Sequence, residues 1–158
     1  MIKPITKTNL NPLIVHWIGD SDVDKEKTDI NKYLESGDCV VKPNGNPAKI
    51  TIKELTYSDI MFIYDYLGLK PEDFQAKNVF QRTLTITVAR LAIQQIEGLP
   101  LKFENKAGNR MLIKEDADAL LQCVEIIKDN GKEDVLSLID WIGGMAYQRA
   151  IFRQFPKR

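Results

Sequence analysis

The chain has 158 residues, enough for one domain, because a chain of this length buries about 70% of the surface that its unfolded form exposes. Lysine plus arginine and aspartate plus glutamate both total 22, so no net charge draws the protein towards nucleic acid or anionic lipid. The sequence has neither a secretory signal nor an apolar run long enough to cross a membrane, so we expect a cytosolic protein.

The start of the chain predicts an arm followed by one domain. Residues 1–12 are polar and contain Pro4 and Pro12, which break regular structure, so we expect an extended arm. Residues 13–158 are expected to form a single mainly helical domain. Its first segment, 13–18, is rich in β-branched residues and predicts a short strand.

A β-hairpin is expected at about 39–53. Asn44-Gly45 lies between two β-prone runs, 39–42 and 49–53, and Asn-Gly is a strong hairpin signal. Prolines on both sides predict a loop longer than two residues.

Three helices are expected next. Thr56 and Asp59 have the spacing of a capping box, and apolar residues then follow at helical spacing until Gly68. A short helix is predicted to start at Pro71. The run from Val79 to Ile96 predicts a long helix stopped by Gly98 and Pro100, although residues 83–88 alternate like a strand.

The last third predicts a small hairpin and two helices. Residues 101–103 and 110–113 flank a loop-forming segment, and an apolar stripe from Ala117 to Ile127 predicts a helix ended by Asn130-Gly131. The final helix carries its apolar side on Val135, Leu138, Ile139, Ile142, Met145, Ala146 and Phe152. Gly143-Gly144 inside this helix predicts a kink or the close approach of another backbone. The expected fold is therefore α+β but predominantly α-helical, a helix bundle with one or two small β-hairpins.

Few residues have the character of catalytic groups. His16 is the only histidine and lies in an apolar run, which favours a structural role over a Ser-His or Cys-His pair. Cys39 and Cys123 lack the spacing of a zinc site, so they are expected to be reduced thiols.

An acidic series imitates half of a calcium loop. Asp20, Asp22 and Asp24 alternate as in an EF-hand, but Lys25 replaces its glycine and Asn31 its final glutamate, which favours a solvated loop. Phosphate-binding glycine motifs are also missing. We expect no catalytic residue, metal or cofactor.

The end of the final helix is the predicted interaction surface. Aromatic and basic residues interleave there, a pattern that fits an acidic protein partner or nucleic acid. The dipole at the C-terminal end of a helix also favours basic residues, so a purely structural role explains the charges equally well. The surface consists of Trp141, Tyr147, Arg149, Phe152, Arg153 and Phe155.

The layout of residues 40–153 resembles that of the small tail-assembly chaperones and related morphogenesis proteins of tailed bacteriophages. The resemblance is carried by "ITIKELTYSDI", with its Leu55-Thr56 helix start, by the glycine-bounded segment 98–108, and by the final "VLSLIDWIGGMAYQRAIF". The first forty residues have no counterpart in the family.

The resemblance implies a mainly helical, non-enzymatic protein of the host cytoplasm that binds the tape-measure protein or other tail components during assembly. It transfers no catalytic residues. One alternative is a structural subunit of the virion that forms a homo-oligomer, and another is a small regulatory protein that binds nucleic acid through the basic C-terminus.

Overall fold

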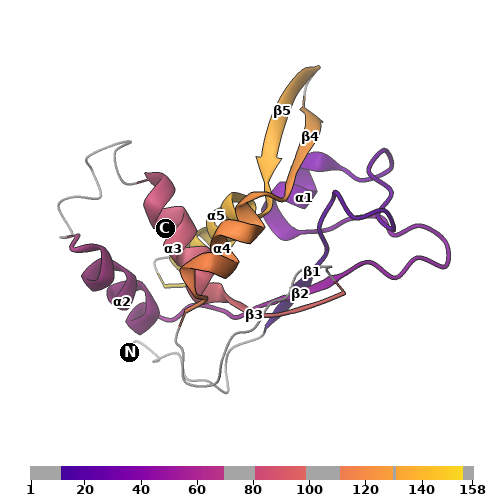
Figure 1. Ribbon diagram of the computed structural model, residues 1–158. Coiled ribbons are helices and arrows are strands. Elements are labelled where there is room, and N and C mark those ends of the chain that lie inside the picture. Colours follow the sequence, from indigo (N-terminus) through magenta and orange to yellow (C-terminus); the bar gives the residue numbers. More distant parts are fainter. Residues whose placement is uncertain (1–11, 70–80, 99–110, 130, 155–158) are drawn as a thin grey trace.

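The computed structural model describes residues 12–69, 81–98, 111–129 and 131–154 (Figure 1). Residues 1–11 of the predicted arm, the helix start at Pro71 and most of the hairpin at 101–113 therefore lie outside the described residues. In chain order the elements are β1 Leu13–Val15, α1 Ile30–Ser36, β2 Lys49–Ile52, α2 Tyr57–Leu67, α3 Gln81–Ala92, β3 Ile93–Glu97, α4 Lys114–Leu121, β4 Val124–Asp129, β5 Lys132–Ser137 and α5 Leu138–Gln154.

The prediction of a predominantly helical bundle is wrong. The described residues form five helices and two small antiparallel sheets. The fold is therefore α+β, and its sheets are more than minor additions to a helix bundle. One sheet has the order β1-β2-β3, and the other is the β4–β5 hairpin. None of the described helices is both long and apolar enough to cross a membrane.

The three-stranded sheet buries one face and exposes the other, as antiparallel sheets do. Val15 pairs with Ile50, and both side chains are buried. Ile14 points to the opposite face and is 57% exposed. The strand expected at 13–18 is therefore present, shortened to three residues, and its alternation matches the one-sided burial.

The hairpin predicted at 39–53 does not form. β2 is present, but it pairs with β1 and β3, while Val41 makes only an isolated bridge with Val23. The Asn-Gly signal does mark a turn, because Gly45 N–H donates to the Lys42 carbonyl at 2.8 Å and Asn44 has φ 60°. The prolines at 43 and 47 have no N–H group to donate to a strand ladder, so the segments on the two sides of this turn do not pair with each other.

The long helix predicted from Val79 to Ile96 ends early. α3 stops at Ala92, and the chain passes directly into β3, which closes the open edge of β2. Ile93 fits this role because its side chain is 1% exposed in the core. A bulge at Gln94 shifts the register between Thr51 and Ile52. Sheet pairing here overrides an apolar spacing that also suits a helix.

Within α3 the prediction of a helix at residues 83–88 is confirmed. The alternating threonines are accommodated because the Thr87 hydroxyl donates to the Thr83 carbonyl, one turn back, at 2.8 Å. Buried Val88, Ala89 and Ala92 form the face that packs on the core.

The helix predicted through Ile127 also ends early, at Leu121. Residues Val124–Asp129 and Lys132–Ser137 form the β4–β5 hairpin instead, with Gly131 at φ 80° in the connection. Gly131 therefore belongs to a hairpin connection and does not mark the end of a helix. Val135, expected on the final helix, lies on β5 and is 64% exposed.

The helix start at Thr56 is confirmed in detail. The Thr56 hydroxyl accepts from Asp59 N–H at 3.1 Å, and the Asp59 carboxylate accepts from Thr56 N–H at 2.9 Å, which completes a capping box. Lys53 Nζ lies 3.2 Å from the same carboxylate. Gly68 ends α2 with φ 68°, as predicted.

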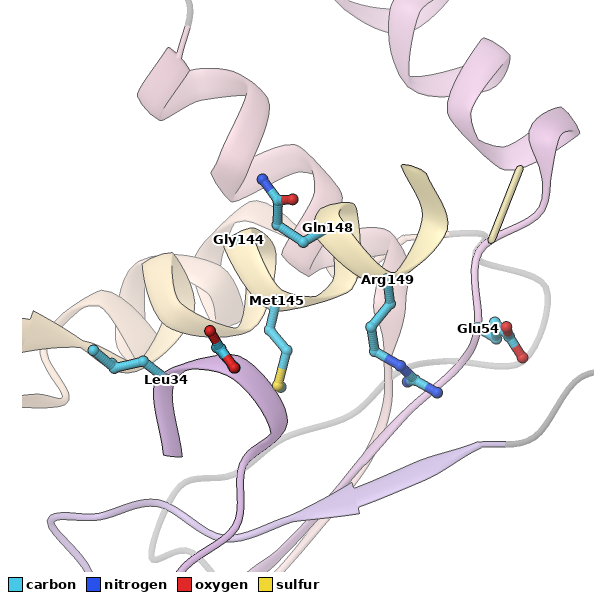
Figure 2. A pocket seen from close by; sticks show the side chains of 7 residues that line it. Leu34, Glu54, Gly144, Met145, Gln148 and Arg149 are labelled. Atoms are coloured by element: carbon cyan, nitrogen blue, oxygen red, sulfur yellow. The ribbon is translucent and has the colours of Figure 1, made fainter. Parts of the chain in front are cut away.

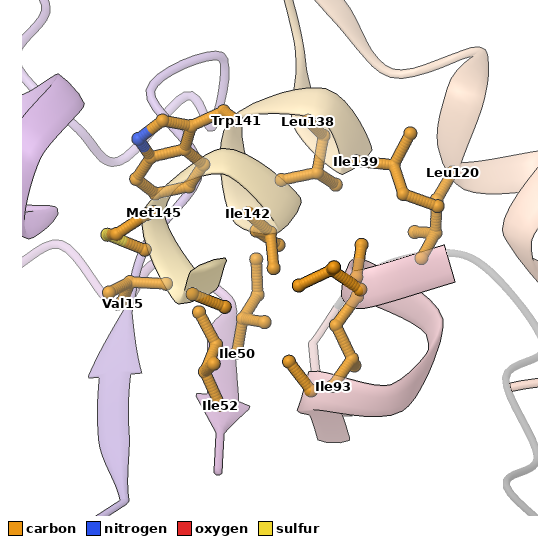
Figure 3. Close-up of a cluster of buried hydrophobic side chains, with 14 of the residues drawn as sticks. Val15, Ile50, Ile52, Ile93, Leu120, Leu138, Ile139, Trp141, Ile142 and Met145 are labelled. Atoms are coloured by element: carbon orange, nitrogen blue, oxygen red, sulfur yellow. The ribbon is translucent and has the colours of Figure 1, made fainter. Parts of the chain in front are cut away.

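Helix α5 lies at the centre of the molecule, where it packs against α3, α4, α1 and β5 (Figures 1 and 3). The prediction of its apolar side is confirmed for the following residues, all of them buried: Leu138, Ile139, Ile142, Met145 and Ala146. A Cβ atom added to Gly143 would overlap the carbonyl oxygen of Thr85 on α3. The close approach predicted at the glycine pair is therefore real at Gly143, whereas a Cβ at Gly144 meets nothing within 4 Å.

Replacing Gly143 with alanine should destabilise the protein by about 2 kcal/mol, because the added methyl forces α3 and α5 apart. Gly144→Ala is the matched control. It should raise stability by up to about 1 kcal/mol, since alanine is the better helix former and has space there. Urea denaturation of both variants measures the difference, and equal stabilities would contradict the close crossing.

Asp59 links stability to pH. Burial alone would raise the pKa of this carboxyl, but the hydrogen bond from Thr56 and the charge of Lys53 outweigh burial and lower the pKa. A lowered folded pKa contributes stability that is present above the unfolded value of about 4 and is lost as the pH falls below it.

Asp59→Asn should therefore cost about 1 kcal/mol at neutral pH. The variant should also lose less stability than the wild-type chain when the pH falls from neutral to below about 4. Denaturation curves at both pH values test this prediction. An unchanged acid dependence would assign the stabilising effect to other carboxyls.

Candidate functional site

The acidic loop is organised by its own carboxylates. Asp20 accepts from Asp22 N–H through one oxygen and from Ala48 N–H through the other, both at 2.9 Å. Asp22 in turn accepts from Asn46 N–H at 3.2 Å. These bonds join the loop to the segment before β2.

The third carboxylate, that of Asp24, makes a local hydrogen bond. Asp24 accepts from Lys27 N–H at 3.2 Å, which stabilises the turn that leads towards α1. Among the residues that the structure describes, no cluster of three metal-ligating side chains is present. Asp20 and Asp22 therefore join the acidic loop to the segment before β2, while Asp24 stabilises a turn within its own segment.

His16 also has a structural contact. Its Nδ1 lies 2.8 Å from the Ala48 carbonyl, and because a carbonyl only accepts, Nδ1 carries the proton in this contact. The thiols of Cys39 and Cys123 are both free and half-buried, as expected of reduced cysteines. Burial raises the pKa of both thiols, and the charge of Asp38 adds to the effect at Cys39. A raised pKa reduces the thiolate fraction and with it the reactivity.

Trp141, from the predicted interaction surface, lies in the core. Its ring stacks on Tyr33 with centroids 4.4 Å apart, and its Nε1–H donates to the Tyr33 carbonyl at 3.2 Å. The Tyr33 hydroxyl donates to His16 O and accepts from Ile18 N–H, each at 2.9 Å. With 5% of its surface exposed, Trp141 joins α5 to α1 and cannot meet a partner.

Of the other members of that predicted surface, the structure describes the side chains of Tyr147 and Arg149. Tyr147 is half-buried, and its hydroxyl is 3.0 Å from that of Tyr64, which links α5 to α2. Arg149 lines a cavity on α5. Phe152 and Arg153 belong to α5, but their side chains are outside the described part of the structure, as is all of Phe155.

Sequence reasoning missed an exposed apolar face on the β4–β5 hairpin, which projects from the body of the protein (Figure 1). Ile126 pairs with Val135, and Val124 lies two residues from Ile126, so all three point to one face. Their side chains are 53% (Val124), 54% (Ile126) and 64% (Val135) exposed. We call these three residues the hairpin face. Recognising Asn130-Gly131 as a hairpin turn between β-branched runs would have found it.

The opposite side of the hairpin is anchored. Ile127 is 4% exposed, and Glu125 makes an ion pair with Lys25 at 2.7 Å. On the outer strand, Val135 N–H donates to the carboxylate of Asp134 at 2.8 Å. A side chain that occupies an N–H group of an edge strand hinders the addition of another strand. The hairpin therefore offers a partner its apolar face more readily than this part of its edge.

A cavity of about 810 Å³ lies beside α5 (Figure 2). Its walls come from the end of α1, from the segment after β2 and from one side of α5. Met145 and Arg149 are one turn apart on α5 and point to the same side. The lining residues are Leu34, Glu35, Glu54, Gly144, Met145, Gln148 and Arg149.

Comparisons with protein families, with curated proteins and with solved structures found no match to this chain.

Asp20→Asn should lower stability by about 1–2 kcal/mol, because an amide nitrogen cannot accept the hydrogen bond that Ala48 N–H donates. Thermal unfolding of the wild-type chain and of the variant, each with and without added calcium, measures this loss and tests whether the aspartates bind a cation. The wild-type melting temperature should not change with calcium. A calcium-dependent rise that Asp20→Asn abolishes would show that the aspartates bind a cation after all.

Proposed function

We propose that this protein is a non-enzymatic interaction factor that resembles a phage tail-assembly chaperone and binds the tape-measure protein or another tail component in the cytoplasm of the infected cell. The observation that carries the proposal is the hairpin face. Exposed β-branched residues that line one side of a projecting hairpin are suited to cover an apolar segment of a partner before assembly.

The roles of the polar groups support an interaction function over an enzymatic one. The groups with the character of ligands or bases, His16 and the aspartates of the acidic loop, are engaged in hydrogen bonds with backbone groups that hold the loops together. Their hydrogen bonds serve the fold, so they offer no nucleophile and base oriented towards each other.

The shape of the hairpin supports a partner that binds on its face. A two-stranded hairpin alone is marginally stable, so a projecting one gains stability when its apolar side is covered. The anchored side, with Ile127 in the core, fixes the direction in which the hairpin face points.

The test is co-expression of the tagged chain with the tape-measure protein of the same phage. The triple variant Val124→Thr, Ile126→Thr, Val135→Thr should capture the partner at least about tenfold less well, because threonine keeps the β-branched shape but lowers the apolar contact. Ile14→Thr is the matched control, since Ile14 is also an exposed β-branched residue on a strand. It should leave capture unchanged.

Equal capture by the triple variant and the wild-type chain would contradict the role of the hairpin face. The two alternatives predict other outcomes. Sedimentation of the purified chain as a large symmetric assembly at micromolar concentration would favour a virion subunit. Retention on DNA or RNA at low salt that weakens as salt rises would favour a nucleic-acid-binding protein.

A further inference from the structure

The cavity beside α5 has a volume typical of a binding site and a chemistry that its own side chains do not complete. At about 810 Å³ it falls within the range of pockets that hold ligands of several hundred daltons. Met145, which is 4% exposed, and the half-buried Leu34 provide its apolar surface. An apolar side chain of a ligand would be covered between them.

The side chain of Arg149 borders this cavity. Its Nη1 atom is buried and has no hydrogen-bond partner within the described part of the chain. A buried guanidinium N–H without an acceptor is unfavourable, and a carboxylate is the acceptor that matches guanidinium geometry best. The arginine therefore favours a ligand that brings an acidic group next to its apolar side chain.

The opposite end of the cavity carries the opposite charge. Glu35 is exposed at the end of α1, and in Figure 2 the labelled residues run from Arg149 through Met145 to Leu34, the neighbour of Glu35 in the chain. The Glu35 carboxylate repels a purely anionic ligand at this end of the cavity. The buried Glu54 also lines the cavity, and in the view of Figure 2 it lies on the Arg149 side. A ligand with an acidic group at one end and a basic group at the other complements both Arg149 and Glu35.

We propose that this cavity binds a short peptide segment of a protein partner, in which an apolar side chain is flanked on one side by an acidic residue and on the other by a basic residue. The acid pairs with Arg149, the apolar side chain lies on Met145 and Leu34, and the base faces Glu35. The inference rests on the proposed function as an interaction protein, and it adds a second contact site, separate from the hairpin face.

Gly144 provides a direct test, because it lines the cavity and has open space around the position of a Cβ atom. Gly144→Leu should narrow the cavity without disturbing the fold, and a melting temperature at least as high as that of the wild-type chain checks this. The probe is a random peptide library displayed on cells and selected against the intact wild-type chain. The selected peptides should share an apolar residue flanked by an acid and a base.

The selected peptides should bind Gly144→Leu at least about tenfold more weakly, and the control Ile14→Thr as well as the wild-type chain. Arg149→Glu reverses the charge without filling the cavity, so selection against it should replace the acid in the peptides with a base. Failure to enrich any peptide, or peptides that bind Gly144→Leu as tightly as the wild-type chain, would overturn the assignment.

The outcomes for the two sites are distinguishable. If the hairpin variants lose the tail protein while Gly144→Leu leaves peptide binding unchanged, the proposed function stands and the cavity assignment is wrong. If Gly144→Leu loses the peptides while the hairpin variants retain the tail protein, the cavity is a peptide site and the hairpin face is not the docking surface.

Discussion

The fold depends on the close crossing of α3 and α5 at Gly143. A glycine at this point lets the backbone of α5 approach the Thr85 carbonyl, and any side chain would force the helices apart. Since α5 also contacts α1, α4 and β5, its position fixes where those elements pack. Trp141 illustrates this dependence, because its stacking on Tyr33 holds α1, and through the Tyr33 hydroxyl the segment after β1, against the same helix.

Local signals in the sequence were sufficient where a segment's own side chains define its structure. The capping box of Thr56 and Asp59 sets the start of α2, and the buried positions of α5 follow a helical period. Such signals failed where pairing with a distant strand decided the outcome. Ile93 and Ile96 have a spacing that suits a helix, but β2 needed a partner on its open edge, and one sequence cannot reveal that need.

Contacts with distant segments, which a single sequence does not reveal, also determined which residues form the binding surfaces. Trp141 and Arg149 fall on one helix in the sequence, yet one is stacked inside the core and the other borders a cavity, because neighbouring elements cover the helix unevenly. The hairpin face was obscured by a single assignment, that of Asn130-Gly131 as the end of a helix. With the hairpin recognised, Val124, Ile126 and Val135 gather on one side of two strands whose other side is anchored by Ile127. A rigid core with an apolar projection and a charged cavity is the physical basis of the proposed interaction role.

Amide hydrogen exchange followed residue by residue tests the central claim most directly, because it measures the opening free energy of each element. If the crossing at Gly143 organises the fold, the amides of α3 and of the buried turns of α5 should be the slowest to exchange. They should share one opening free energy, equal to that of global unfolding, while the outer residues of β4 and β5 exchange faster. Exchange of α5 at a lower free energy than β1 and β2 would contradict the account, since the sheet would then be stable without the helix.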